Sequence, residues 1–123
     1  MKRILINLTN HPSNKWSIEQ IEAANNYGSI IDIPFPVVDE KGDEQYIKDL
    51  VKEYFNKVLI YKSDCNITVH IMGEMTFTFA LIKLLQEQGI KCISSTTKRI
   101  VIDEGDGVKE KVIFEFERFR EYI

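Results

Sequence analysis

The chain has 123 residues, which is the length of one domain and is enough to bury a sizeable core. Its 16 basic and 19 acidic side chains give a formal net charge of −3, which argues against long nucleic acids as partners but leaves a small nucleotide open. No secretory signal and no apolar stretch of bilayer length is visible, so we expect a single domain over residues 1–123, no membrane association and a cytoplasmic location.

The first half of the chain predicts strands and helices in alternation. Residues 2–8 form an apolar run, and turn-forming residues rich in donors and acceptors follow at 9–14. Ser17 is placed to cap a helix over residues 17–27, which Gly28 would end. Residues 29–33 form a second strand, closed by prolines, and apolar residues recurring every three or four positions predict a long amphipathic helix from 43 to 59.

The second half predicts a buried strand over residues 67–72 and a helix that continues to about residue 88 and ends at Gly89. A short strand then begins at Lys91 and passes into a polar loop at 94–99. Residues 99–103 and 112–119, joined by a turn at 104–107, predict a β-hairpin with one apolar face.

This order of elements predicts an α/β fold: a Rossmann-like, mainly parallel sheet flanked by helices on both faces, with a C-terminal β-hairpin. The order of the strands stays open. Loops that follow parallel strands share one edge of the sheet, so we expect His11, Glu74 and the segment 94–99 to lie close together.

The strand-to-helix turn formed by Gly73, Glu74, Met75 and Thr76 is a candidate ligand site. The amides and the dipole at a helix N-terminus favour an anion, so the turn predicts a bound phosphate or carboxylate. Neither a dinucleotide fingerprint nor a P-loop occurs in the sequence. The alternative is that Glu74 is an ordinary first-turn acid and that the glycine serves helix packing.

The two histidines allow different interpretations. His11 follows the first strand, where an imidazole can act as a general acid or base or can bind a phosphate. The alternative is a surface histidine in a turn. His70 lies inside an apolar strand, where a satisfied core histidine is more common than a catalyst, and both interpretations stay open.

The most unusual polar run of the chain contains Ser95, Thr96, Thr97, Lys98 and Arg99. Hydroxyl groups and paired cations suit the oxygens of a phosphate. The alternative is a solvated loop that leads into an edge strand. A serine nucleophile would need a base within reach, and no spacing indicates one, so the run favours ligand binding over nucleophilic catalysis.

Cys65 and Cys92 lie in or beside apolar runs, and the sequence has no CxxC or Cys/His metal spacing. We therefore expect reduced thiols, no metal and no cofactor.

The exposed edge of the hairpin is the expected dimer surface. Several aromatic side chains are expected in the core or at an interface rather than stacked on a base: Trp16, Tyr61, Phe114, Phe116 and Phe119.

Four short segments carry a family resemblance: NLTNHP at 7–12, VHIMGEM at 69–75, GIKC at 89–92 with STTKR at 95–99, and FERFREY at 116–122. In these segments the chain resembles the small stand-alone proteins of the CRISPR-associated Rossmann-fold (CARF-like) type, including the ring nucleases encoded beside type III CRISPR systems. The resemblance spans nearly the whole chain.

The resemblance implies a homodimer that binds a cyclic oligoadenylate second messenger across its two-fold axis and cleaves it, which switches off the antiviral response. In such enzymes a ribose 2′-hydroxyl attacks the adjacent phosphate without a metal, while the protein aligns the attack and neutralises charge. By this resemblance, Lys98 or Arg99 would stabilise charge and His11 would move a proton. Thr9, Asn10, Thr76, Ser95 and Thr96 would position phosphates.

Two other function classes stay open at this point. One is a non-catalytic sensor that binds the same ligand and passes the signal to a partner. The other is a Rossmann-like interaction module with no nucleotide ligand.

Overall fold

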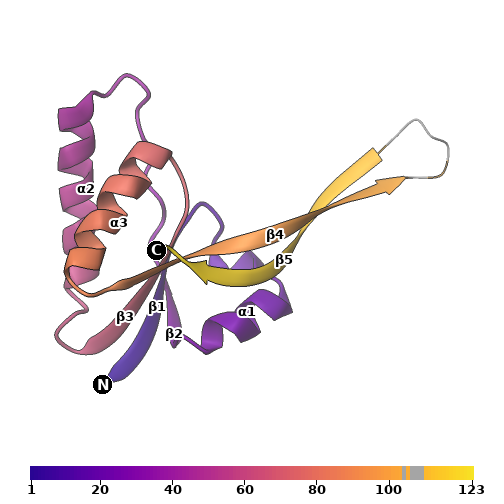
Figure 1. Ribbon diagram of the computed structural model, residues 1–123, viewed down its shortest axis with the longest axis horizontal. Coiled ribbons are helices and arrows are strands. Elements are labelled where there is room, and N and C mark those ends of the chain that lie inside the picture. Colours follow the sequence, from indigo (N-terminus) through magenta and orange to yellow (C-terminus); the bar gives the residue numbers. More distant parts are fainter. Residues whose placement is uncertain (104, 106–109) are drawn as a thin grey trace.

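In a computed structural model, which describes residues 1–103, 105 and 110–123, five strands form one sheet with three α-helices against it (Figure 1). The strands are β1 (Lys2–Leu8), β2 (Ser29–Asp32), β3 (Cys65–Ile71), β4 (Lys91–Asp103) and β5 (Glu110–Glu121). The helices are α1 (Ile18–Asn25), α2 (Glu44–Leu59) and α3 (Met75–Glu87), and a short 3₁₀ turn, η1 (Ser13–Lys15), precedes α1.

The strand order is β2-β1-β3-β4-β5, with parallel pairing from β2 to β4 and antiparallel pairing between β4 and β5. The α/β class, the helices on both faces and the C-terminal hairpin are thereby confirmed. The prediction of a mainly parallel sheet is corrected to a mixed sheet, because the chain returns from β4 by a hairpin and makes its longest pairing there. The turn predicted at 104–107 lies, apart from residue 105, outside the described residues.

The sequence predicted a loop at 94–99. In the structure this polar run is instead part of the continuous strand β4. Thr96 and Thr97 are β-branched, which suits a strand, and they stand opposite Arg118 and Phe116 of β5. One residue of β5 is left out of the pairing at this point, so the ribbon carries a β-bulge. Beyond the bulge the two strands extend away from the rest of the sheet (Figure 1). We call this part, residues 97–103 of β4 and 110–116 of β5, the hairpin arm.

β1 is buried on both faces because it lies inside the sheet. Ile4, Ile6 and Leu8 belong to the larger core cluster, which α2 and α3 cover, whereas Leu5 packs with Ala24 of α1 on the opposite face. Helices therefore pack against both faces of β1, and the carboxyl end of β1 lies between them. No helix in the described part of the chain is long and apolar enough to cross a membrane.

Local signals in the sequence fix several element ends. The Ser17 side chain accepts a hydrogen bond from the Gln20 amide, as the predicted cap requires. Gly28 has a φ of +134° and lies so close to β1 that an added Cβ would stand 2.3 Å from the Arg3 carbonyl oxygen.

The thiols of Cys65 and Cys92 are free, and burial raises the pKa of Cys92 to about 12.

Candidate functional site

The candidate site lies at the point of the sheet where the connections between strands change direction. β2 is on one side of β1, whereas β3 and β4 are on the other, so the connections that leave β1 and β3 diverge. In open α/β sheets a crevice at this point, outside the carboxyl ends of the strands, is the usual place for a ligand. An open pocket of about 1020 Å³ lies there in this protein.

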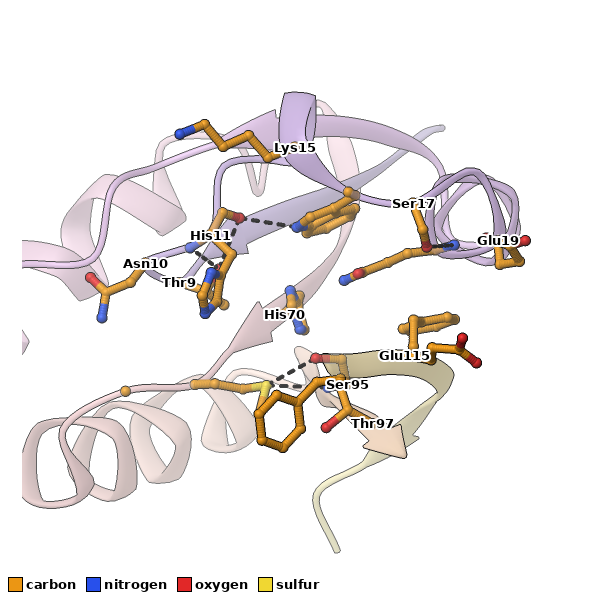
Figure 2. Close-up of a pocket in the computed structure, with 16 residues that line it drawn as sticks. Thr9, Asn10, His11, Lys15, Ser17, Glu19, His70, Ser95, Thr97 and Glu115 are labelled. Carbon is orange, nitrogen blue, oxygen red and sulfur yellow. Dashed lines mark hydrogen bonds between the residues drawn. The ribbon is translucent and has the colours of Figure 1, made fainter. Parts of the chain in front are cut away.

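Segments from three distant parts of the chain, near residues 9–20, 70–73 and the hairpin, line the pocket (Figure 2). The segment after β1, the approach to α1 with its first residues, the end of β3, and the facing strands of the hairpin each contribute side chains. The lining residues are Thr9, Asn10, His11, Lys15, Trp16, Ser17, Glu19, Gln20, His70, Met72, Gly73, Ser95, Thr97, Phe114, Glu115 and Phe116.

The pocket brings together half of the residues that the sequence singled out. Those that line it are Thr9, Asn10, His11, Gly73, Ser95 and Thr97. The others are not among its lining residues: Glu74, Met75, Thr76, Thr96, Lys98 and Arg99. The expected approach of the segment after β1 to the polar run of β4 is therefore present, but Glu74 is not part of it.

Glu74 is outside the pocket because its carboxylate caps α3. One oxygen accepts hydrogen bonds from the Phe77 amide at 2.8 Å and from the Thr76 hydroxyl at 2.7 Å. The bond from Thr76, followed by that from Phe77, holds the pKa of Glu74 below its usual value. The chain's own carboxylate thus takes the place where the sequence predicted an external anion, in agreement with the alternative interpretation of Glu74.

Replacing Glu74 by alanine should lower the free energy of unfolding by about 1 kcal/mol, the typical loss for a helix cap. Urea unfolding measures the change. Glu87→Ala at the other end of α3 is the matched control, because removing an acid from a helix C-terminus should be neutral or slightly stabilising. Equal losses in the two variants would contradict the capping role.

The alternation of side chains along β4 divides the polar run. Ser95 and Thr97 line the pocket, whereas the intervening Thr96 donates its hydroxyl to the Arg118 carbonyl oxygen at 3.2 Å. Lys98 and Arg99 lie farther along the hairpin arm, opposite Glu115 and Phe114 of β5. Although Glu115 and Phe114 line the pocket of a single chain, the two cations assigned to charge stabilisation are not among its lining residues.

A row of polar side chains crosses three strands beneath the pocket. Asn7 of β1 stands in register with Asp32 of β2 and with His70 of β3. The Asn7 amide nitrogen donates to an Asp32 carboxylate oxygen at 2.8 Å and to the His11 carbonyl oxygen at 2.9 Å. The Asn7 amide oxygen accepts from the Thr9 hydroxyl at 2.9 Å and lies 3.0 Å from Nδ1 of His70. Every polar atom of this buried amide is therefore satisfied.

This row fixes the state of His70. Because Asp32 orients the Asn7 amide, the amide oxygen faces Nδ1 of His70, and Nδ1 must carry the hydrogen. Nε2 then presents a lone pair and has no hydrogen-bond partner among the described residues. Burial, with a smaller effect from nearby His11, lowers the pKa of His70 to about 4. His70 is a buried, neutral histidine that also lines the pocket.

Aromatic rings form much of the remaining wall. The Trp16 indole donates to the His11 carbonyl oxygen at 3.0 Å, and its ring meets that of His70 edge to face at 5.4 Å. Phe119 is buried, as predicted. Phe116 is half-buried, and Phe114 keeps 64 % of its surface exposed at the pocket. Flat, partly exposed rings of this kind provide stacking surface for a planar ligand.

The charged residues are distributed unevenly around the pocket. Figure 2 shows Lys15 and His11 toward one side, whereas Glu19 and Glu115 lie toward the other. An anion is therefore favoured near Lys15 and His11 and disfavoured at the opposite side. Among the residues that the structure describes, no group of three or more histidine, cysteine or acidic side chains is placed to hold a metal ion.

Sequence reasoning gave no role to Asn7, Asp32 or Lys15. A signal for the first two exists, because each is a polar residue within or at the end of an apolar strand, and such a residue needs a hydrogen-bond partner. Lys15 lies in an exposed polar segment that resembles any other surface turn.

The family comparison covers this whole arrangement. A profile of the Uncharacterized protein MJ1673 family matches residues 3–120. The chain belongs to this family. The match to the MJ1673 family runs from β1 into β5 and so includes every segment that lines the pocket. Comparisons with curated proteins and with solved structures found no match.

Proposed function

We propose that the pocket binds a cyclic oligoadenylate second messenger and that the protein cleaves it, as a ring nuclease of type III CRISPR antiviral defence. The observation that carries this proposal is one pocket, at the switch point of the sheet, that combines His11 and Lys15 with the half-buried ring of Trp16 and the exposed ring of Phe114. A nucleotide offers the complementary pair of groups, an anionic phosphate and a flat base. The choice of a cyclic oligoadenylate comes from the family resemblance of the sequence.

The charge distribution favours one orientation of a nucleotide. A phosphate belongs near Lys15 and His11, where Asn10 adds a polar side chain, because Glu19 and Glu115 would repel it at the other side. The base then lies toward the aromatic side chains. In this orientation Ser95 and Thr97 supply hydroxyl groups from β4.

The proposed reaction uses a nucleophile that the ligand itself supplies. The ribose 2′-oxygen forms a bond to the adjacent phosphorus, the bond from phosphorus to the 5′-oxygen breaks, and a 2′,3′-cyclic phosphate remains. The 2′-hydroxyl loses its proton and the leaving 5′-oxygen gains one. His11 accepts the first proton as general base and returns a proton to complete the exchange, and Lys15 stabilises the negative charge that develops on the phosphate oxygens. The protein also holds the attacking and leaving oxygens in line.

A second copy of the chain is part of the proposal. A cyclic oligoadenylate carries one negative charge per phosphate, whereas the only lysine or arginine among the described residues that line one pocket is Lys15. Pairing of two chains doubles that charge. The hairpin arm provides an apolar surface for such pairing, since Val101, Val112 and Phe114 share one face of the ribbon and are each more than two-fifths exposed.

The test is to incubate the purified protein with cyclic tetra-adenylate and with cyclic hexa-adenylate in the presence of a chelator, and to resolve the products by chromatography. Replacing His11 by alanine should slow cleavage roughly 100-fold or more while the ring still binds, because general acid–base catalysis contributes on that scale. Lys48→Gln on α2, exposed on the opposite face of the sheet, is the control and should cleave normally.

The three function classes give different results. Cleavage that depends on His11 supports the ring nuclease. An intact ring with a clear binding isotherm would leave a non-catalytic sensor, and no binding of either ring would leave an interaction module without a nucleotide ligand.

A further inference from the structure

One buried polar atom at the pocket lacks a hydrogen-bond partner. His70 is 2 % exposed, and its Nε2 has no partner among the described residues. Buried polar atoms in native proteins are almost always paired, and leaving one unpaired is costly. Because His70 also lines the pocket, a bound ligand is in a position to supply the missing partner.

The row of polar side chains defines what that partner must be. Nδ1 of His70 is the donor to Asn7, so Nε2 of the neutral ring can only accept a hydrogen bond. The low pKa, about 4, keeps the ring neutral throughout the physiological range. A phosphate oxygen is excluded as the partner, because it also offers only lone pairs. The partner must carry an N–H or O–H hydrogen that it can donate.

The surroundings of His70 favour a base over a sugar. The rings of Trp16 and Phe119 meet the imidazole edge to face, with centroid distances of 5.4 and 5.2 Å. Figure 2 shows the His70 ring between the side of the pocket that carries His11 and the side that carries Ser95 and Thr97. Phe119 is buried behind His70, whereas Trp16 lines the pocket together with Phe114 and Phe116 and offers a planar base a surface for stacking. The edge of adenine carries an exocyclic amine with two N–H groups.

We propose that Nε2 of His70 accepts a hydrogen bond from the exocyclic amine of an adenine and so determines which base the pocket holds. This inference rests on the proposed function, since it concerns the base of the adenylate ligand. His70 acts here as a residue that determines specificity, and Asn7 and Asp32 are positioning residues that act through it.

The experiment compares two rings on three proteins by isothermal titration calorimetry. All three carry His11→Ala, so that the rings stay intact, and the one that keeps His70 is called the wild type. The rings are cyclic tetra-adenylate and the same ring built from purine riboside, which lacks the amine. The proteins are the wild type, His70→Asn, whose amide can still donate to Asn7 but offers no acceptor at Nε2, and His70→Gln, whose amide can reach the Nε2 position. Urea unfolding verifies that both variants are folded.

We expect the wild type to bind the amine-free ring roughly 100-fold more weakly than cyclic tetra-adenylate. A ring held across two chains meets two His70 side chains, and each lost buried hydrogen bond costs about tenfold. His70→Asn should bind the two rings equally, and His70→Gln should recover part of the preference. In a wild-type sample with ¹⁵N-labelled histidine, adding cyclic tetra-adenylate should shift the Nε2 resonance of His70 and leave Nδ1 protonated.

Other outcomes would overturn the inference in distinguishable ways. Equal loss on removal of the amine in wild type and His70→Asn would reject the role of His70 while the proposed function stands. A preference that follows the 2′-hydroxyl, tested with an all-2′-deoxy ring, would assign the acceptor to the sugar instead. Failure of the folded wild type to bind any ring would reject the proposed function and this inference together.

Discussion

Replacing Asn7 by aspartate should lower the free energy of unfolding at pH 7 by about 3 kcal/mol, in the range expected when a buried polar network loses its partners. The Asn7 side chain is almost fully buried, and its nitrogen donates to Asp32 and to the His11 carbonyl oxygen. A carboxylate at position 7 has no hydrogen to donate, so it would face two acceptors. Attraction to His70 would compensate for only one of these lost contacts.

Urea unfolding at pH 7 measures this effect. Asn10→Asp introduces the same charge three residues away on an exposed side chain, and it should change the unfolding free energy by no more than about 0.5 kcal/mol. Similar stabilities for the two variants would contradict the hydrogen-bond directions assigned to Asn7, and with them the tautomer of His70.

Lowering the pH from 7.5 to 5 should remove about 2 kcal/mol of stability through His70 alone. The pKa of His70 is about 4 in the folded protein, against an ordinary value of 6.5. Between these values the unfolded chain binds a proton more readily than the folded chain. The stability is therefore fully present above pH 6.5 and is lost progressively as the pH falls toward 4.

His70→Gln isolates this contribution, because glutamine does not titrate while every other ionisable group is retained. The wild type should lose about 2 kcal/mol more than His70→Gln between pH 7.5 and pH 5, as measured by urea unfolding at each pH. Replacing His11 by glutamine should reduce the loss slightly, because His11 is the second cause of the low pKa of His70. Parallel pH profiles for the wild type and His70→Gln would show that the imidazole is not buried as described.

Sequence patterns predicted the elements that local chemistry determines. β1, β3 and the amphipathic helix α2 follow from the period of their apolar residues, and Ser17 caps α1 as its position indicated. β4 was different. Its polar middle, residues 94–99, has no apolar period, and it is a strand because β5 pairs with it, which is a tertiary contact that no local pattern contains.

The candidate site was predictable only in part for a related reason. Parallel topology was enough to bring His11 near Ser95 and Thr97, because the carboxyl ends of parallel strands share one edge of the sheet. Glu74 was ambiguous, since a helix-capping acid and a ligand-binding acid occupy the same position in a sequence. The contact between Asn7 and His70 joins residues 63 positions apart and depends on the exact register of β1 against β3.

The polar row also bears on how these strands align during folding. In strands buried on both faces, sliding β1 by two residues keeps each apolar side chain on its original face, so hydrophobic burial discriminates weakly between the two alignments. The same slide would place Asn7 opposite Ile30 and Thr68, or opposite Pro34 and Met72. Asp32 and His70 would then both lose their hydrogen-bond partner Asn7. Asn7 thus favours the native register of β1 against both β2 and β3. The polar residues at the candidate site therefore also destabilise sheets in which these strands pair out of register.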